Sequence, residues 1–360
     1  MKLCILAFSS NKDRGHRRRN KMGSCSVDRL EVFEVGPCKD GYQMGLLIGQ
    51  RFSETIRSRV ASDLILQNQL RPFAHSPHSQ SLLKPLFYNN QTKFPRYWDE
   101  LLGTAAGSGV PFLDILLINL RKEILAFIQK EGAKSANSDT SDDCSDVLVV
   151  SESMAIAAHN EDANVALVGH TYIIKGILPD GLFFVGYTYA GELPSCAFGF
   201  NSHGLAFTLD SVPPAEDEIV AGGIGRNFIS RDLLEATSMD DAMNVRFCLL
   251  LLPILMNSFI TLVFSLSVLI SSEDQIVQDE SSISRHKRAA VLTKESKGDF
   301  LSLLGDMDDK KHPIYMTGPL LHTLCTALID LDKQTLSIIE GNPKKGDVSH
   351  VFSIAPQKSP

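Results

Sequence analysis

The residue with the clearest chemical potential is Cys144, which stands between a polar segment and an apolar run. Residues 130–143 are rich in Ser, Asp, Ala and Lys without periodicity, whereas residues 147–150 read Val-Leu-Val-Val, which is typical of a buried strand. A cysteine used only for packing would not be flanked by Asp143 and Ser145. A thiol in this position could be a nucleophile, because a thiolate readily attacks carbonyl carbon. A packed thiol remains the alternative interpretation.

A predicted hairpin places acidic and polar groups beside this thiol. Strand patterns on both sides of a turn at residues 152–153 predict antiparallel pairing, which sets Cys144 opposite Glu161 or Asp162. The turn has no Asn-Gly signature, so the register is determined only to within a residue or two. The segment His159-Asn160-Glu161-Asp162 is therefore expected beside Cys144.

The elements that must position this pair indicate an α+β fold. Helical patterns precede Cys144, and short strands follow it. Gly41, Gly45 and Gly49 recur every four residues, which puts them on one helix face suited to close packing. The expected elements are a strand over residues 32–35, helices over 41–60, 81–107, 113–128 and 228–243, strands over 147–150, 154–158, 183–189, 195–200 and 205–209, and a hairpin of 324–331 with 335–339.

Composition limits the partners of the chain. It has 360 residues with a net charge of −7, which argues against nucleic acid as the main partner. Residues 1–21 nevertheless carry seven Lys or Arg against one Asp. We expect three parts: a basic unstructured extension at residues 1–28, a mainly helical segment at 29–143, and a β-rich segment of the same domain at 144–356 that begins with Cys144.

The cysteines argue for an intracellular protein without a structural metal. There are seven, an odd number, and no pair has CxxC spacing. This pattern predicts a reduced set and no metal ligands. Cytoplasm and organelle are not distinguished, and a membrane location is the alternative considered below.

Several motifs in order give the chain a resemblance to a known family. It resembles the acyl-coenzyme A:6-aminopenicillanic acid acyltransferase family, and its plant members most closely. The resemblance covers residues 30–244 and resumes near residue 275. The motifs that carry it are Gly41-Tyr42-Gln43-Met44-Gly45, residues 119–123, Asp143-Cys144-Ser145-Asp146, His159-Asn160-Glu161-Asp162, residues 199–205 and Gly341-Asn342-Pro343.

The resemblance implies a four-layer αββα sandwich and a self-cleaving N-terminal-nucleophile hydrolase of cysteine type. The bond between Asp143 and Cys144 would break autocatalytically, so that one precursor becomes two chains and Cys144 becomes an amino terminus. A free α-amino group titrates near pH 8, so it can take the thiol proton. The implied activity is that of an amide-bond hydrolase or acyltransferase that works through a thioester.

The same resemblance assigns roles around the nucleophile. Asp162 matches the family's aspartate and would orient the α-ammonium, while backbone N–H groups and an asparagine would hold the oxyanion. The implied partner is a small amide or acyl substrate, with no cofactor and with acyl-coenzyme A as a candidate co-substrate. The supporting positions are His159, Asn160, Asn201 and Arg285.

Alternatives to these roles stay open. A papain-type pair of Cys144 and His159 is disfavoured because the Cys-Gly-Ser-Cys-Trp context is absent. A cysteine hydrolase without self-cleavage is a weaker third interpretation. Arg285 fits a solvated basic helix face equally well, and the polar residues Asn119, Arg121 and Glu123 favour a buried structural network over a site.

One apolar block interrupts the resemblance. Residues 247–270 contain 18 apolar residues of 24 and no charge, which is long enough for a membrane span. Pro253, Asn257 and several serines argue against a span, as does the need for both flanks to share one core. We therefore expect residues 245–274 to be translated intron or a splice product that replaces family strands and leaves the sandwich incomplete. The alternative function is an inactive splice variant or wrongly assembled isoform, associated with membranes through 247–270.

Overall fold

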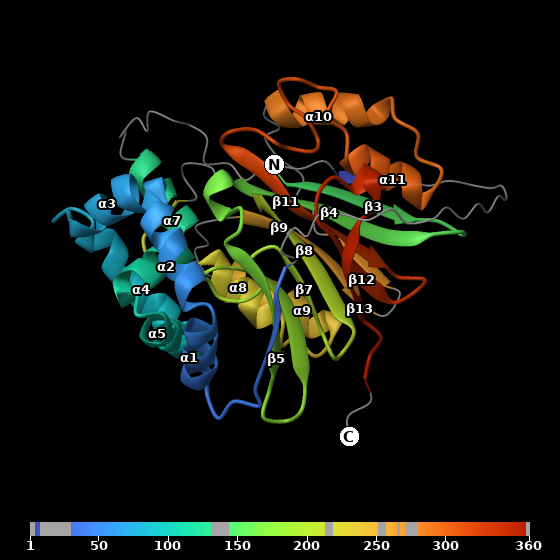
Figure 1. Cartoon of the computed structure of the whole chain (residues 1–360). Coiled ribbons are helices and arrows are strands. Elements are labelled where there is room, and N and C mark those ends of the chain that lie inside the picture. Colours follow the sequence, from blue (N-terminus) through green and yellow to red (C-terminus); the bar gives the residue numbers. More distant parts are fainter. Residues whose placement is uncertain are drawn as a thin grey trace.

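Two β-sheets pack face to face at the centre of the molecule (Figure 1). The computed structural model describes residues 4–7, 30–130, 144–212, 219–250, 257–264, 267–270 and 280–357. A six-stranded sheet has the order β1-β3-β4-β11-β12-β13 and a seven-stranded sheet the order β10-β9-β8-β7-β6-β5-β2. The strands are β1 (Cys4–Ala7), β2 (Val32–Val35), β3 (Ser145–Val150), β4 (Ala155–Asn164), β5 (Thr171–Ile177), β6 (Phe183–Tyr189), β7 (Phe198–Asn201), β8 (Leu205–Val212), β9 (Asn257–Phe264), β10 (Ser267–Ile270), β11 (Leu321–Asp330), β12 (Thr335–Ile339) and β13 (Val348–Ser353).

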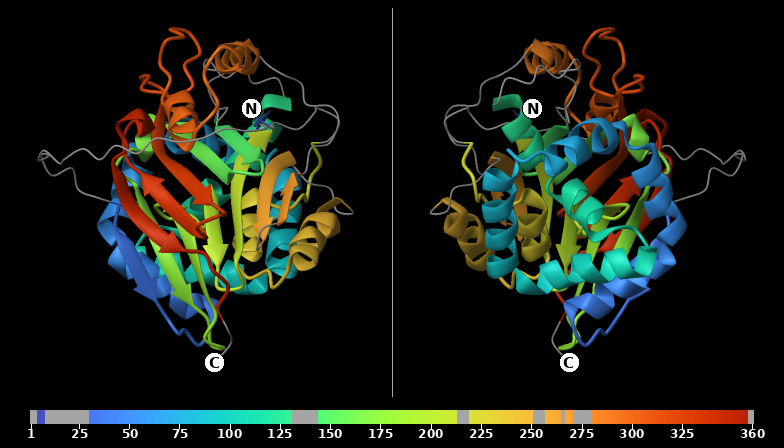
Figure 2. Two further views of the ribbon diagram at one scale, coloured as in Figure 1. Left: turned by 90° about the vertical axis from the view of Figure 1, so that its right-hand side faces the viewer. Right: turned by 90° about the vertical axis from the view of Figure 1, so that its left-hand side faces the viewer.

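Helices cover the outer faces of both sheets. Those before Cys144, with α8, bury apolar residues against the seven-stranded sheet, whereas α10 and α11 lie on the outer face of the six-stranded sheet (Figures 1 and 2). The αββα sandwich expected from the sequence is confirmed. The helices are α1 (Gly41–Arg51), α2 (Ser53–Ser62), a π-helix (Leu66–Leu70), α3 (Arg71–His75), α4 (Gln80–Lys93), α5 (Pro95–Ser108), α6 (Phe112–Asn119), α7 (Arg121–Lys130), α8 (Arg226–Leu233), α9 (Met239–Leu250), α10 (Glu280–Ala290) and α11 (Lys297–Leu304).

In the β3–β4 hairpin, side chains at odd-numbered and even-numbered residues face different layers of the molecule. Side chains alternate along a strand, so residues two apart share a face. Ala157 and Ala163 of β4 belong to the core between the sheets, whereas Ile156 and Ala158 pack with α11. In β3, Leu148 faces the other sheet, while Val147 and Val149 face the helices. Odd positions of β4 and even positions of β3 therefore point into the sandwich.

The glycine-bearing helix face predicted from the sequence packs closely against another helix. The helical pattern divides into α1 and α2, because Phe52 leaves helical dihedral angles at φ −106° and ψ 24°. Within α1, a Cβ at Gly45 would lie 1.8 Å from the carbonyl oxygen of Glu100 in α5. The two helix backbones are thus too close for any side chain at this position.

Replacing Gly45 with Ala should lower the free energy of unfolding by roughly 1–3 kcal/mol, since the packed backbones must separate. Urea denaturation measures this change. Gly298→Ala in α11 is the matched control, because the nearest atom to its new Cβ is Ser296 Oγ at 3.7 Å. The control should leave stability unchanged or raise it by up to about 1 kcal/mol. Equal stability of Gly45→Ala and the wild type would contradict the close contact.

Two segments differ from the sequence-based expectations. Within residues 1–28, expected to be unstructured, Cys4–Ala7 forms β1 and pairs in parallel with β3. Where an incomplete sandwich was predicted at residues 245–274, the chain supplies the end of α9 and the strands β9 and β10. All of β9 pairs antiparallel with β8, from Val212↔Asn257 to Leu205↔Phe264. Among the described residues, no helix is long and apolar enough to span a membrane.

The physical reason for the second difference is that apolar length alone does not specify a helix. Residues 257–270 are mainly Phe, Ile, Leu, Val and Thr. Most of these residue types are common in β-strands, at the edge or in the core of a sheet. A partner strand then supplies hydrogen-bond partners for the backbone N–H and C=O groups. The alternative of a spanning helix at 247–270 is therefore not what the described residues form.

Candidate active site

Cys144 lies directly before β3 and opposite Glu161 of β4. Ser145 pairs with Asn160, so the antiparallel register expected from the hairpin is confirmed. Cys144 Sγ lies 3.7 Å from Glu161 Oε2 and 3.8 Å from the carbonyl oxygen of Asp162, and the side chain is buried. The thiol therefore points into the sandwich beside a carboxylate rather than into a purely apolar core.

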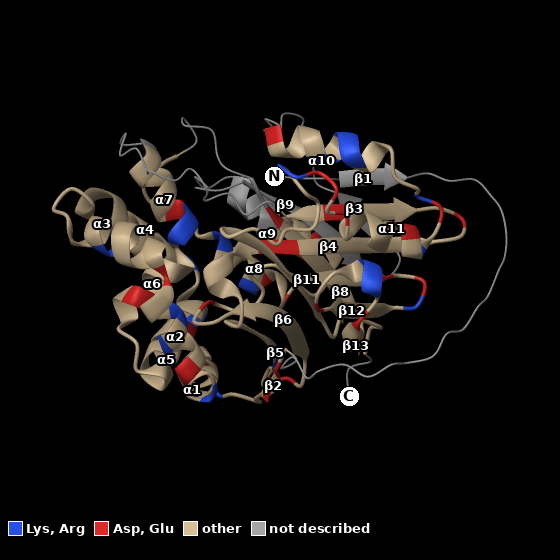
Figure 3. Ribbon diagram, turned by 45° about the horizontal axis from the view of Figure 1, so that its top comes forward, with Lys and Arg blue, Asp and Glu red and all other residues tan. Residues whose placement is uncertain are grey.

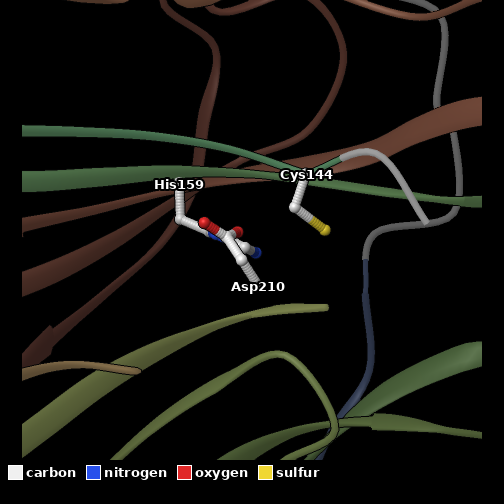
Figure 4. Close-up of side chains that lie close together, drawn as sticks. All are labelled: Cys144, His159 and Asp210. Carbon is white, nitrogen blue, oxygen red and sulfur yellow. The ribbon is translucent and has the colours of Figure 1, made fainter. Parts of the chain in front are cut away.

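A fully buried histidine joins this carboxylate to two others. His159 Nε2 lies 2.8 Å from Glu161 Oε2, and Nδ1 lies 2.6 Å from Asp146 Oδ1. Asp210 of β8 adds a carboxylate oxygen 3.6 Å from Nδ1. Figure 4 shows the side chains of Cys144 and His159 extending from one sheet and that of Asp210 coming from the opposite side.

These contacts determine the protonation of His159. A neutral imidazole has one donor nitrogen and one acceptor nitrogen, whereas both nitrogens here face carboxylate oxygens. Burial opposes the charged ring, but the charge and hydrogen bond of Asp146, with further bonds to Cys144 and Glu161, raise the pKa of His159 well above its usual value. The two carboxylate neighbours and the raised pKa therefore favour the imidazolium form of His159, which can donate from both nitrogens.

Hydroxyl groups from the seven-stranded sheet complete this network. Tyr189 of β6 donates to Glu161 Oε1, and Thr208 of β8 donates to Asp146 Oδ2 at 2.8 Å. Each carboxylate is thus held from both sheets. Figure 3 marks the acidic residues on the central strands β3 and β4, where most neighbouring positions are uncharged.

Asp162 and Arg285 meet on the other face of β4. Arg285 of α10 donates to Ser145 Oγ at 3.0 Å and lies 4.0 Å from Asp162 Oδ2. Thr323 donates to the second oxygen of Asp162. Burial raises the pKa of Asp162 well above its usual value, and Thr323 and Arg285 offset this only in part. Arg285 is fully buried, so the alternative of a solvated basic face is wrong.

The two asparagines named from the sequence hold backbone rather than the thiol. Asn160 donates to the carbonyls of Leu304 and Ile314, which anchors α11 to the six-stranded sheet. Asn201 donates to the carbonyls of Leu234 and Ala236, at 3.2 and 2.7 Å. The structure thus groups Cys144 with His159, and Asp162 with Arg285, while both asparagines bind backbone elsewhere. Asp143 lies outside the described residues.

Burial favours the protonated thiol of Cys144. It raises the pKa of Cys144, the charge of Glu161 raises it further, and His159 opposes both effects. Cys144, His159 and Asp210 also bring ligand-type atoms within 4.8 Å of one another, which could suit a metal. Both nitrogens of His159 are engaged by carboxylates, however, so this arrangement is better suited to holding and moving protons.

A pocket reaches the network through Tyr189. Its walls come from α2, α6, α7 and α8 and from the ends of β4, β6 and β11. The buried ion pair of Arg59 with Glu192 lies in its wall, and Asn227 donates to the same glutamate at 2.7 Å. The lining residues are Arg59, Ile65, Ile118, Asn119, Arg121, Lys122, Glu123, Leu125, Asn164, Leu167, Tyr189, Glu192, Arg226, Asn227 and Leu321.

The polar residues expected to form a structural network do so within this wall. Asn119 bridges the backbone of Gly191 and Leu193, both at 2.9 Å. Arg121 donates to Asp63 at 2.6 Å, and Glu123 accepts from the backbone N–H of Arg226 at 2.8 Å. These contacts shape the pocket between the helical layer and the sheet.

Sequence reasoning named His159 and expected Glu161 beside Cys144, but it gave no role to Asp146. Asp146 stands inside a recognised motif, and strand parity would have found it, since it shares a face with Cys144 and His159. Asp210 and Tyr189 come from the facing sheet. Neither has a neighbouring motif that points to this site.

Comparisons with known proteins bear on the same region. Residues 149–247 match the sequence model of the acyl-coenzyme A:6-aminopenicillanic acid acyl-transferase family. The resemblance to this family is confirmed. The chain is also 28% identical over 214 residues to a β-alanyl-dopamine/carcinine hydrolase of Drosophila melanogaster, which covers 57% of this chain and 54% of the relative. The chain therefore spans about half the length of that curated relative.

A solved structure similar to the chain is penicillin V acylase from Agrobacterium tumefaciens. The match has a TM-score of 0.30 and 11% identity, and it covers 53% of this chain and 80% of the other. The match of the family's sequence model begins at residue 149 within β3, so it excludes Cys144, and it includes all of β4 and α8.

Proposed function

We propose that the chain is a self-processing amide hydrolase or acyltransferase whose nucleophile is the amino-terminal thiol of Cys144. The observation that carries this proposal is the buried contact of Cys144 Sγ with Glu161, at the point where β3 begins. The matched family is named for acyl transfer, and the curated relative for the hydrolysis of β-alanyl-dopamine and carcinine. Both reactions break or form a bond at an acyl carbon.

Once Cys144 is an amino terminus, its α-amino group can take the thiol proton. The thiolate adds to the amide carbonyl of the substrate, and the carbon–nitrogen bond breaks as the nitrogen gains that proton. A thioester and a free amine result. Water then cleaves the thioester to an acid, or a second amine takes the acyl group. No cofactor is required, and acyl-coenzyme A could deliver the same thioester as a co-substrate.

The pocket beside Tyr189 is where we place the substrate. Its lining combines apolar side chains with several polar and charged groups, as is usual for small-molecule sites. Tyr189 contributes to its lining and donates to Glu161, which contacts the thiol. Cys144 does not line this pocket, so the route from a small amide seated there to the thiol passes Tyr189 and Glu161. Asp162 would orient the α-ammonium from the other face of β4.

Trapping the acyl-enzyme tests this proposal. The full chain is mixed with a p-nitrophenyl ester as a generic acyl donor, quenched in acid and measured by intact mass. The fragment that begins at Cys144 should gain one acyl group, and hydroxylamine should remove it, since thioesters are cleaved by this amine. Added primary amine distinguishes transfer from hydrolysis by the product formed. A processed, folded chain that takes up no acyl group would instead favour the inactive-isoform alternative.

A further inference from the structure

Self-cleavage must begin before the amino-terminal base exists. In the uncut chain the nitrogen of Cys144 belongs to a peptide bond, so it has no lone pair available for the thiol proton. Burial keeps that proton on sulfur. The first step therefore needs a different acceptor within reach of Sγ.

Several groups near Sγ could be considered for this task. Asp210 lies within 4.8 Å of Sγ, but the hydrogen-bond contact of the thiol with a carboxylate is made to Glu161. His159 is poorly suited as an acceptor, because both of its nitrogens lie against carboxylate oxygens and its pKa is raised toward the charged form. Asp162 presents its carboxylate to Thr323 and Arg285, and only its backbone oxygen is near the thiol. Glu161 Oε2 lies 3.7 Å from Sγ, within the reach of a sulfur hydrogen bond.

We infer that Glu161 is the general base of self-cleavage, an assignment that rests on the proposed function of Cys144. The thiol proton passes to Oε2, and the thiolate attacks the carbonyl carbon of Asp143. The peptide bond between Asp143 and Cys144 then breaks, and the nitrogen of Cys144 takes the proton from Glu161. The products are a thioester between Asp143 and the Cys144 sulfur, and a free α-amino group on Cys144. Water then cleaves the thioester to release the Asp143 carboxyl group and restore the thiol.

The neighbours of Glu161 position it for this role. Tyr189 donates to Oε1 and His159 to Oε2, so the side chain cannot rotate away from the thiol. The imidazolium also stabilises negative charge on either sulfur or carboxylate, which eases proton transfer between them. After cleavage the α-amino group takes over as base, so Glu161 is needed for processing more than for turnover.

The test compares self-cleavage in three full-length variants by the time course of intact mass. Glu161→Gln keeps the shape but loses the base, and it should slow cleavage by at least about 10²-fold. Glu161→Asp should be intermediate. Glu152→Gln is the matched control, because it makes the same substitution at an exposed residue in the turn of the same hairpin. It should cleave at the wild-type rate.

An external cut separates this inference from the proposed function. A protease recognition sequence is inserted so that the cut leaves Cys144 as the first residue. Glu161→Gln cut in this way should take up the acyl group of a p-nitrophenyl ester as the wild type does. Absence of cleavage in folded wild type would refute the proposed function itself. Normal cleavage of Glu161→Gln, or a folded and cut variant that stays unreactive, would overturn the assignment of Glu161.

If Glu161→Gln fails to fold, the pH dependence of the self-cleavage rate of Tyr189→Phe tests the assignment of Glu161 instead. Removing a donor to a carboxylate disfavours its charged form, so the acidic limb of the cleavage rate should move to higher pH. An unmoved limb would overturn the assignment. The titratable groups around Glu161 are Cys144 before β3, His159 and Asp162 of β4, Tyr187 and Tyr189 of β6, Cys196 between β6 and β7, and Cys325 of β11.

Discussion

Cys144→Ala should remain one uncut polypeptide, whereas the wild type should yield a fragment that begins at Cys144. The substitution removes the sulfur that attacks the preceding carbonyl, so no thioester can form. Intact-mass measurement of the purified full chain distinguishes the two outcomes directly. The loss should be complete, because among the described cysteines only Cys144 follows directly on the proposed cleavage bond.

A second buried cysteine provides the control. Cys38 is also buried, but it lies in the wall of a different pocket beside α1. Cys38→Ala should therefore be processed like the wild type. A folded wild-type chain of intact mass, with no fragment starting at Cys144, would contradict self-cleavage. Processing of Cys144→Ala to the same extent as the wild type would mean that another residue is the nucleophile.

Asp162→Asn should abolish most turnover and yet stabilise the uncut chain near neutral pH. The amide cannot hold the α-ammonium by charge, so activity should fall on the order of 10²–10⁴-fold. Stability changes in the opposite direction because the carboxylate is buried, with a raised pKa. Asparagine has nearly the same shape and carries no charge to desolvate.

The pH dependence follows from the direction of that shift. The native chain holds the Asp162 proton up to a higher pH than the unfolded chain does. Stability must therefore fall as the pH rises from the unfolded pKa of Asp through the folded one. Asp162→Asn should remove this part of the pH dependence. Urea unfolding of uncut protein, in the Cys144→Ala background, measures it across that interval.

Two results would contradict this account of Asp162. Lower stability of Asp162→Asn near neutral pH would mean that Arg285 and Thr323 favour the charged carboxylate more than burial opposes it. Unchanged turnover after an external cut before Cys144 would mean that Asp162 does not orient the α-ammonium. Each measurement is independent of the other, because one uses the uncut and the other the cut chain.

Local patterns predicted the hairpin that carries the candidate site. The strand pattern around residues 152–153 placed Cys144 opposite Glu161 or Asp162, since antiparallel pairing about a short turn leaves few registers, and the structure decides for Glu161. The four-residue glycine repeat likewise predicted a closely packed helix face, and the structure supplies its partner, α5. In both cases, the information lies within one element or between sequence neighbours.

The apolar block at residues 247–270 shows where such patterns fail. Its length matched a membrane span, and its composition also matched strands. A spanning helix and a strand differ in where the backbone N–H and C=O groups find hydrogen-bond partners. Here the partner strand is β8, which is distant in sequence. Hydropathy carries no information on which strand edge is available.

The sequence by itself determined the nucleophile candidate, its hairpin partner and the family resemblance, because these depend on residue order and period. Only the tertiary structure decided the protonation of His159 and placed Asp210 and Tyr189 at the site. Those contacts cross from one sheet to the other. Their geometry depends on how two independently formed sheets align, which is decided by packing of the shared core and not by any local repeat.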